Sequence, residues 1–167
     1  MTNQVPEDYR SFARQIALQF LFQLEARQGD CLEMLDDFIA EQTRKNQTKV
    51  LAEKWIKGSW TEQSTLDALI VSVSDNWKIE RLANIDHANL RLGVWQLLNA
   101  KEISHHIVID EAIELAKQFG SEQSPGFING VLDAVWRKID HKDFDLTPFQ
   151  ENNSTTSDET KELKEDF

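Results

Sequence analysis

Residues 109–139 read IDEAIELAKQFGSEQSPGFINGVLDAVWRKI. In the first part of this stretch apolar residues recur every three or four positions up to Gly120, which is typical of an amphipathic helix that ends at a glycine. The same spacing returns from Ile128 to Val135. Between the two, Ser124 is a preferred N-cap residue and Pro125 suits the first helical position. The stretch therefore predicts two consecutive helices joined by a short turn.

Upstream of this pair, the same periodicity predicts five more helices and no strand. Their apolar residues fall within 9–24, 32–39, 50–56, 66–77 and 90–98. The third of these helices is expected to stop near Gly58, and Ser59 with Glu62 resembles a capping box that opens the fourth. Gly93 and Gly130 lie inside helical patterns, where glycine costs about 1 kcal/mol relative to alanine, so both predict the close approach of another helix. The predicted fold class is all-α, with about seven helices.

The chain has 167 residues, one cysteine and a net charge of −11. A single cysteine excludes an internal disulfide, and the longest apolar run, 68–71, is far below the roughly 20 residues of a membrane-spanning helix. The first ten residues are polar, so we expect no signal peptide and a cytoplasmic location. Residues 140–167 carry nine acidic and three basic side chains. We expect one helical domain over 1–144 and a disordered acidic tail over 145–167.

The sequence contains no pattern that is typical of an enzyme. His105 and His106 form its one histidine pair, and the further ligands that a metal site needs are not found at suitable spacing. Cys31 has no base or acidic cluster arranged around it and is expected to be a small packing residue. A glycine-rich phosphate loop is also missing. We therefore expect a binding protein with no catalytic residue, metal or cofactor.

Two stretches are candidates for binding. The first is a stripe at four-residue steps along the first predicted helix, made of Arg10, Arg14, Leu18 and Phe22. It is either a contact strip for phosphate and a partner protein or a row of salt-bridged surface arginines beside a wide core face. The second is 123–127 at the start of the last predicted helix, where free backbone N–H groups suit an anion and the phenyl ring can stack on a base. The alternative for this ring is that it attaches the helix end to the core.

Several motifs of the chain resemble the NusB family of bacterial transcription antitermination factors. The resemblance is strongest for IDEAIELAKQFG at 109–120 and FINGVLD at 127–133, and IDHANLRL at 85–92 and RQIALQFLF at 14–22 also fit. It implies an all-α fold of two helical subbundles and a non-enzymatic, RNA-binding role. Family members bind the boxA element of ribosomal RNA leaders together with NusE, a protein of the small ribosomal subunit. The pair helps the RNA polymerase elongation complex to resist termination.

The resemblance also implies contact residues. Those expected to touch RNA are Arg10, Arg14, Gln123, Ser124 and Phe127. Glu80 and Asp86 match acidic positions that face basic residues of NusE, and Leu18 and Phe22, the apolar end of the stripe, are the other expected partner contacts. The family includes monomers and homodimers, so a homodimer is also compatible with the sequence.

The chain departs from the family at the start of its first helix, where a run of arginines is common and the sequence reads RSFAR at 10–14. Each lost phosphate contact weakens the salt-dependent part of RNA binding. Gln123, in contrast, replaces a common acidic residue and so removes a repulsion from phosphate. Two alternatives therefore stay open: a NusB-like regulatory or interaction protein with weakened RNA binding, and a truncated N-terminal domain of a ribosomal RNA methyltransferase. The second would need a glycine-rich cofactor domain after the bundle.

Overall fold

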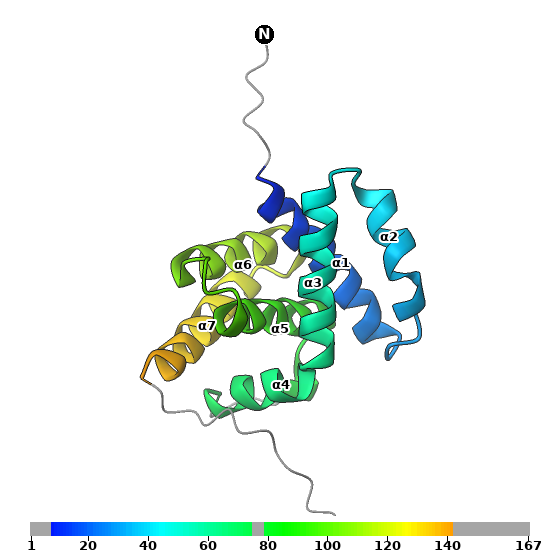
Figure 1. Ribbon diagram of the computed structural model, residues 1–167. Coiled ribbons are helices and arrows are strands. Elements are labelled where there is room, and N and C mark those ends of the chain that lie inside the picture. Colours follow the sequence, from blue (N-terminus) through cyan, green and yellow to red (C-terminus); the bar gives the residue numbers. More distant parts are fainter. Residues whose placement is uncertain (1–7, 75–78, 142–167) are drawn as a thin grey trace, which may run out of the picture.

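The computed structural model of the chain describes residues 8–74 and 79–141. This part consists of seven α-helices, two short 3-10 helices and their connections, and it contains no strand (Figure 1). The elements are α1 (Tyr9–Ala26), η1 (Leu32–Met34), α2 (Leu35–Gln42), α3 (Asn46–Thr61), α4 (Gln63–Ser72), η2 (Ile79–Arg81), α5 (Asn84–Asn99), α6 (His105–Phe119) and α7 (Ser124–Asp140). The predicted all-α class with seven helices is confirmed. Trp77, which was expected on the fourth helix, and the predicted tail at 145–167 lie outside the described residues.

The helices pack around α5. In Figure 1, α1, α2 and α3 lie together on one side, α6 and α7 form a pair on the other, and α5 passes between them and contacts both sets as well as α4. Every residue of α5 from His87 to Leu97 is buried, as expected for a helix with neighbours on all sides. Arg14, early in α1, bonds to Gln96, late in α5, whereas Glu25, late in α1, contacts His87. The two helices are therefore antiparallel.

The ends of α1 follow from local chemistry. Asp8 is the N-cap, and its Oδ1 accepts a hydrogen bond of 3.0 Å from the backbone N–H of Arg10. After the helix, Gln28 and Gly29 have φ values of 53° and 89°, in the left-handed region. A Cβ on Gly29 would lie 3.1 Å from the indole of Trp60 at the end of α3. Glycine thus permits both the turn and the approach of the tryptophan.

The predicted boundary between the third and fourth helices is wrong. The helix α3 continues past Gly58 to Thr61, because this glycine makes room for a side chain of α5: a Cβ there would lie 2.3 Å from Cε2 of Trp95. Ser59 is fully buried inside α3, and Glu62 makes no side-chain capping bond. The predicted capping box is therefore absent, and α4 begins without it.

The other local predictions have mixed outcomes. Gly93 is a close-approach site as predicted, since a Cβ there would lie 2.9 Å from Cδ1 of Leu132 on α7. Gly130 is not: the place of its Cβ has no neighbour within 4 Å, and the residue is exposed. Ser124 is the first residue of α7 rather than its N-cap. Cys31 is buried in the core, in agreement with its predicted packing role.

Candidate nucleic-acid and partner interfaces

The start of α7 brings an expected RNA contact and an expected partner contact together. The hydroxyl of Ser124 donates to Oδ2 of Asp86 over 3.0 Å and accepts from the backbone N–H of Ser121 over 2.9 Å. Ser124 itself is buried, so its hydroxyl ties the start of α7 to the first turn of α5. A Cβ on Gly120 would lie only 2.6 Å from this oxygen, which explains the glycine at the end of α6. The two expected surfaces therefore adjoin at the contact between Ser124 and Asp86.

The neighbours of Ser124 leave a surface available there. Gln123 is exposed, and Phe127 is partly buried with its ring packed against the core. One part of the ring packs against the core and the rest is accessible, so the role of Phe127 as a stacking surface for RNA stays a prediction. Of the three residues expected to contact RNA at this end of α7, Ser124 is buried, and only Gln123 and part of Phe127 are accessible.

Arg14 is not on the surface, so the expectation of a surface stripe along α1 is wrong. The residue is 2% exposed, its Nε donates to Oε1 of Gln96 over 2.9 Å, and its guanidinium lies 5.1 Å from the ring centre of Trp55. Burial lowers the pKa of Arg14, and the charge of Glu111, with Nη1 and Oε2 3.7 Å apart, only partly offsets this. The role of Arg14 as an RNA contact stays a prediction, and it would require the side chain to leave this position.

The other three residues of the stripe differ in their exposure. Leu18 is completely buried, which contradicts its expected place on an open strip, whereas Phe22 is 40% exposed. Arg10 is partly exposed, and its guanidinium lies 5.7 Å from the ring centre of Tyr9. The physical reason is that α1 packs against α2, α3 and α5, so the face that carries Arg14 and Leu18 is part of the core. Only the two ends of the predicted stripe remain accessible.

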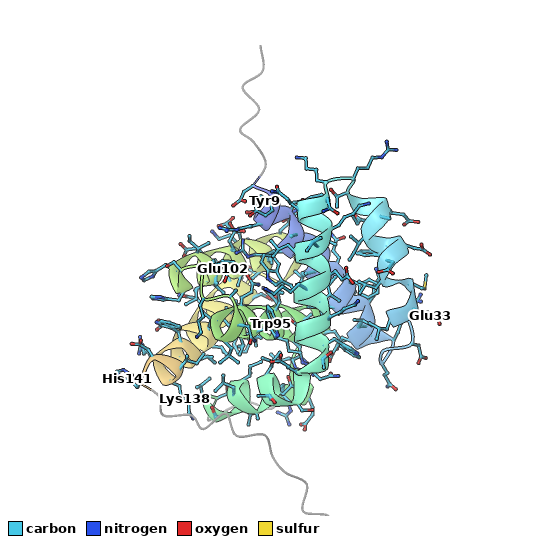
Figure 2. All side chains as sticks on the ribbon, viewed as in Figure 1. Tyr9, Glu33, Trp95, Glu102, Lys138 and His141 are labelled. Carbon is cyan, nitrogen blue, oxygen red and sulfur yellow. The ribbon has the colours of Figure 1, made fainter. Side chains whose placement is uncertain are left out.

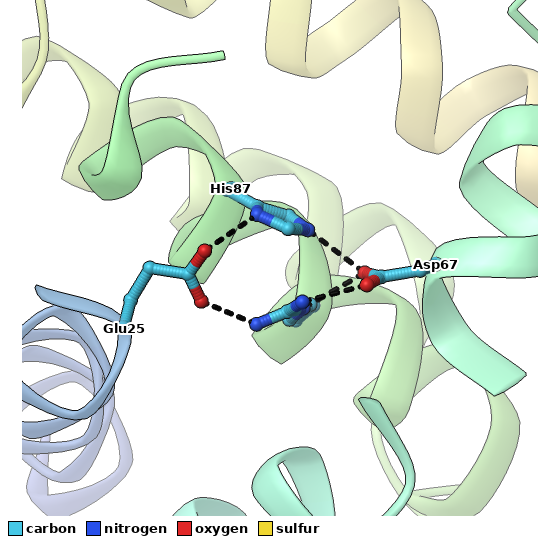
Figure 3. A network of polar contacts seen from close by, with 4 residues as sticks. Glu25, Asp67 and His87 are labelled. Carbon is cyan, nitrogen blue, oxygen red and sulfur yellow. Dashed lines mark hydrogen bonds and ion pairs between the residues drawn. The ribbon is translucent and has the colours of Figure 1, made fainter. Parts of the chain in front are cut away.

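The first two turns of α5 carry a polar network that the sequence analysis missed (Figure 3). His87 places Nδ1 3.0 Å from Oε1 of Glu25 on α1 and Nε2 2.8 Å from Oδ1 of Asp67 on α4. Arg91 donates to Asp67 from Nε over 2.8 Å and from Nη2 over 2.6 Å, and to Oε2 of Glu25 from Nη1. Both nitrogens of the imidazole face carboxylate oxygens, a geometry that a ring with two N–H donors satisfies. The network joins α1, α4 and α5 beside Asp86.

The charges of this network stabilise one another. Burial by itself would raise the pKa of Asp67, but the hydrogen bonds and positive charges of Arg91 and His87 outweigh it and lower the pKa. Burial would likewise lower the pKa of Arg91, and the two carboxylates outweigh it and raise the pKa. The sequence signal was present only as one basic and one titratable side chain four residues apart on a buried helix, with partners far away along the chain.

The expected RNA contacts fall into two regions that lie at different ends of α5. Arg10 lies one turn before Arg14, which bonds to Gln96, whereas Ser124 bonds to Asp86. With a rise of about 1.5 Å per residue, the positions of Asp86 and Gln96 along α5 are separated by about 15 Å. Glu80 is exposed on η2, shortly before α5, on the Asp86 side of the bundle. A ligand that touches both regions must therefore be extended.

The histidine pair begins α6. The ring of His105 stacks on that of Trp136, with centres 4.3 Å apart and planes 10° apart. Within 8–74 and 79–141, no three His, Cys, Asp or Glu side chains are grouped so that they could hold a metal ion. Over the same residues, no helix combines the length and the apolar character needed to cross a membrane.

Comparisons with known proteins agree with this architecture. The model of the NusB family matches residues 11–137. The transcription antitermination protein NusB of Sorangium cellulosum is 37% identical over 136 residues, which cover 81% of this chain and 97% of that protein. A structure of NusB from T. maritima has a TM-score of 0.70 at 33% identity and covers 77% of this chain and 91% of that one. A crystal structure of antitermination factors NusB and NusE in complex with dsRNA has a TM-score of 0.71 at 25% identity, with 77% and 96% covered. The chain therefore belongs to the NusB family of non-enzymatic transcription antitermination proteins.

Proposed function

We propose that this chain binds boxA-type RNA of ribosomal RNA leaders together with NusE and thereby supports processive elongation by RNA polymerase. The observation that carries the proposal is the 3.0 Å hydrogen bond from Ser124 to Asp86, because it joins the expected RNA surface to the expected NusE surface. A relative of the same fold has been crystallised with NusE and RNA, which supports the same pairing. In this reading Gln123, Phe127 and Arg10 contact RNA, and Glu80, Asp86 and Phe22 contact NusE.

The charge distribution explains why the partner is needed. The chain carries a net charge of −11, and of the two arginines near the start of α1 only Arg10 is accessible. Phosphate binding by cationic side chains supplies much of the affinity for RNA, so the chain alone should bind weakly. The acidic side chains at Glu80 and Asp86 complement a basic partner, which favours rapid and specific encounter. The heterodimer then presents the basic charge that the isolated chain lacks.

The test is a filter-binding titration of single-stranded boxA RNA with this chain alone, with NusE alone and with both. We expect weak binding to the chain alone and much tighter binding to the pair. If NusE does not increase the affinity, the alternative of a helical interaction protein with weakened RNA binding is correct. The burial of Arg14 is the observation that favours this alternative.

A charge reversal tests the partner surface separately. Glu80→Lys should weaken the complex with NusE, and the effect should shrink as salt rises, because exposed charges are screened. Glu80 is the better choice for this test, since Asp86 also accepts the bond from Ser124 and its loss would disturb α7. Glu41→Lys, an exposed reversal on α2, is the matched control and should leave the affinity for NusE unchanged. Equal affinities of the Glu80 variant and the wild type at low salt would show that NusE binds elsewhere.

A further inference from the structure

A groove of about 390 Å³ lies between the first turn of α1, the first half of α3 and the connection from α5 to α6. Tyr9 and Arg10 line it from α1, Val50 and Lys54 from α3, and Glu102 from the connection. Figure 2 labels Tyr9 at the start of α1 and Glu102 below it, beside α6. None of the expected RNA contacts except Arg10 belongs to this groove.

The groove combines apolar surface with positive charge. Val50 is 57% exposed, and Tyr9 adds an aromatic ring to the lining. Arg10 and Lys54 are the cations of the lining, and Glu102 is its one acidic residue among the described side chains. This mixture of an aromatic ring, an aliphatic surface and two cations is typical of sites for single-stranded nucleic acid.

The surroundings add to the positive charge. Arg44 and Lys45 are exposed and directly precede the first residue of α3. Glu53, the acidic residue nearest to Lys54 on this helix, is held by Lys57 at 2.6 Å. In a chain with a net charge of −11 this is a local concentration of basic side chains. An anion is therefore attracted here although the molecule as a whole repels it.

We propose that this groove binds one nucleotide of a single-stranded RNA, with the base against Tyr9 and Val50 and the phosphate between Arg10 and Lys54. The proposal rests on the proposed function and extends its RNA surface from α1 onto α3. It also accounts for the missing arginines at the start of α1, because α3 supplies cations beside the same turn. An RNA strand that occupies both the groove and the start of α7 runs along the length of α5.

Four substitutions at three residues, made in the assembled complex with NusE, test the site. Fluorescence anisotropy of a labelled single-stranded boxA RNA is measured at several salt concentrations. Lys54→Gln should weaken binding about three- to tenfold and reduce the slope of log K against log salt by about 0.7, the value for one phosphate contact with a single strand. Glu102→Gln should strengthen binding a few-fold, because it removes a repulsion. Tyr9→Leu should weaken binding about tenfold, whereas Tyr9→Phe keeps a stacking ring and should bind like the wild type.

Arg137→Gln is the matched control for the loss of one positive charge. Arg137 is exposed in the last turn of α7 and pairs with Asp133, and the neighbouring Lys138 is labelled far from Tyr9 in Figure 2. The affinity of the Arg137→Gln complex for RNA should stay within twofold of that of the wild-type complex. Far-ultraviolet circular dichroism of each variant checks that the helices are intact.

The outcomes separate this inference from the proposed function. If the wild-type complex does not bind the RNA, both are overturned. If Arg10→Gln weakens binding while Lys54→Gln and Glu102→Gln change neither affinity nor salt slope, the proposed function stands and the groove is not an RNA site. A rise in RNA affinity in Lys54→Gln would mean that the groove holds an acidic protein segment that competes with RNA, which also overturns the proposal.

Discussion

Replacing Asp67 by asparagine should cost about 2–3 kcal/mol of folding free energy. Asp67 is 25% exposed and accepts two hydrogen bonds from Arg91, of 2.8 and 2.6 Å, and one of 2.8 Å from His87. Removing one partner of a buried ion pair typically costs about 3–5 kcal/mol, because the other charge is left without compensation. The loss of stability in Asp67→Asn should be at or below the lower end of this range, since Asp67 keeps some contact with water and Glu25 still pairs with both His87 and Arg91.

The measurement is urea denaturation followed by circular dichroism at neutral pH. Asp133→Asn is the control, because its carboxylate is 45% exposed and pairs only at the surface with Arg137. Such exposed pairs contribute about 0–1 kcal/mol, so the control should lose little stability. A loss below about 0.5 kcal/mol in Asp67→Asn would refute the conclusion that this network stabilises the contact between α1, α4 and α5.

The pH dependence of the stability of Asp67→Asn tests whether the charge of Asp67 is the cause of the stabilisation. The native pKa of Asp67 lies below its ordinary value of 3.8, because Arg91 and His87 outweigh the effect of burial. The folded state therefore binds this proton less readily than the unfolded state, and stability rises with pH wherever the two differ. The contribution of ionised Asp67 to the free energy of unfolding should be complete above about pH 5 and should be lost as pH falls below 3.8 toward the native pKa. The difference in free energy of unfolding between the wild type and Asp67→Asn should become smaller as pH falls over this range. If this difference stayed constant down to pH 3, the charge of Asp67 would not be the cause of the lost stability.

Four further changes to the chain have expected outcomes. Gly93→Ala should destabilise the fold by about 1–3 kcal/mol in urea, since its Cβ would lie 2.9 Å from Leu132, whereas Gly130→Ala, with open space around it, should be neutral or stabilising. Phe127→Ala should weaken RNA binding by about 1–3 kcal/mol and cost less stability than the roughly 3–5 kcal/mol of a fully buried phenylalanine, as a binding titration beside a thermal melt would show. We expect the acidic segment 145–167 to compete with phosphate for basic side chains, so deleting Asp145–Phe167 should tighten RNA binding by the complex with NusE at low salt, with the two titrations converging as salt rises.

The helices could be predicted from the sequence because each has a regular apolar face, and the end of α6 at Gly120 could be predicted as well, but the boundary between α3 and α4 could not. In the sequence Gly58 looks like a helix end, because glycine is common just after the last turn of a helix. In the structure a glycine is needed at this position because Trp95 packs onto it from another helix. Gly93 and Gly130 look alike in sequence, and only the position of Leu132 separates them. A glycine in a helical pattern does not by itself show whether a neighbour excludes a side chain there, because that depends on contacts formed only in the folded chain.

At the candidate site, too, contacts between helices could not be predicted from the sequence. The four-residue spacing from Arg10 to Phe22 correctly predicts one face of a helix, but it does not tell what covers that face. In the structure the face is covered along its middle, so Arg14 bonds to Gln96 inside the molecule. Sequence patterns of this kind detect neighbours within one helix, and they do not detect contacts between helices.

The network of Glu25, Asp67, His87 and Arg91 is the clearest example, because its members come from three helices. Its place gives it a consequence for function. Asp86 directly precedes His87, so the residue expected to meet NusE and the residue held by two carboxylates share the first turn of α5. The same Asp86 accepts the bond from Ser124 at the start of α7. A change that loosens His87 should therefore weaken both expected surfaces together, and Asp67→Asn should lower the affinity for NusE although Asp67 is not among the residues expected to contact it.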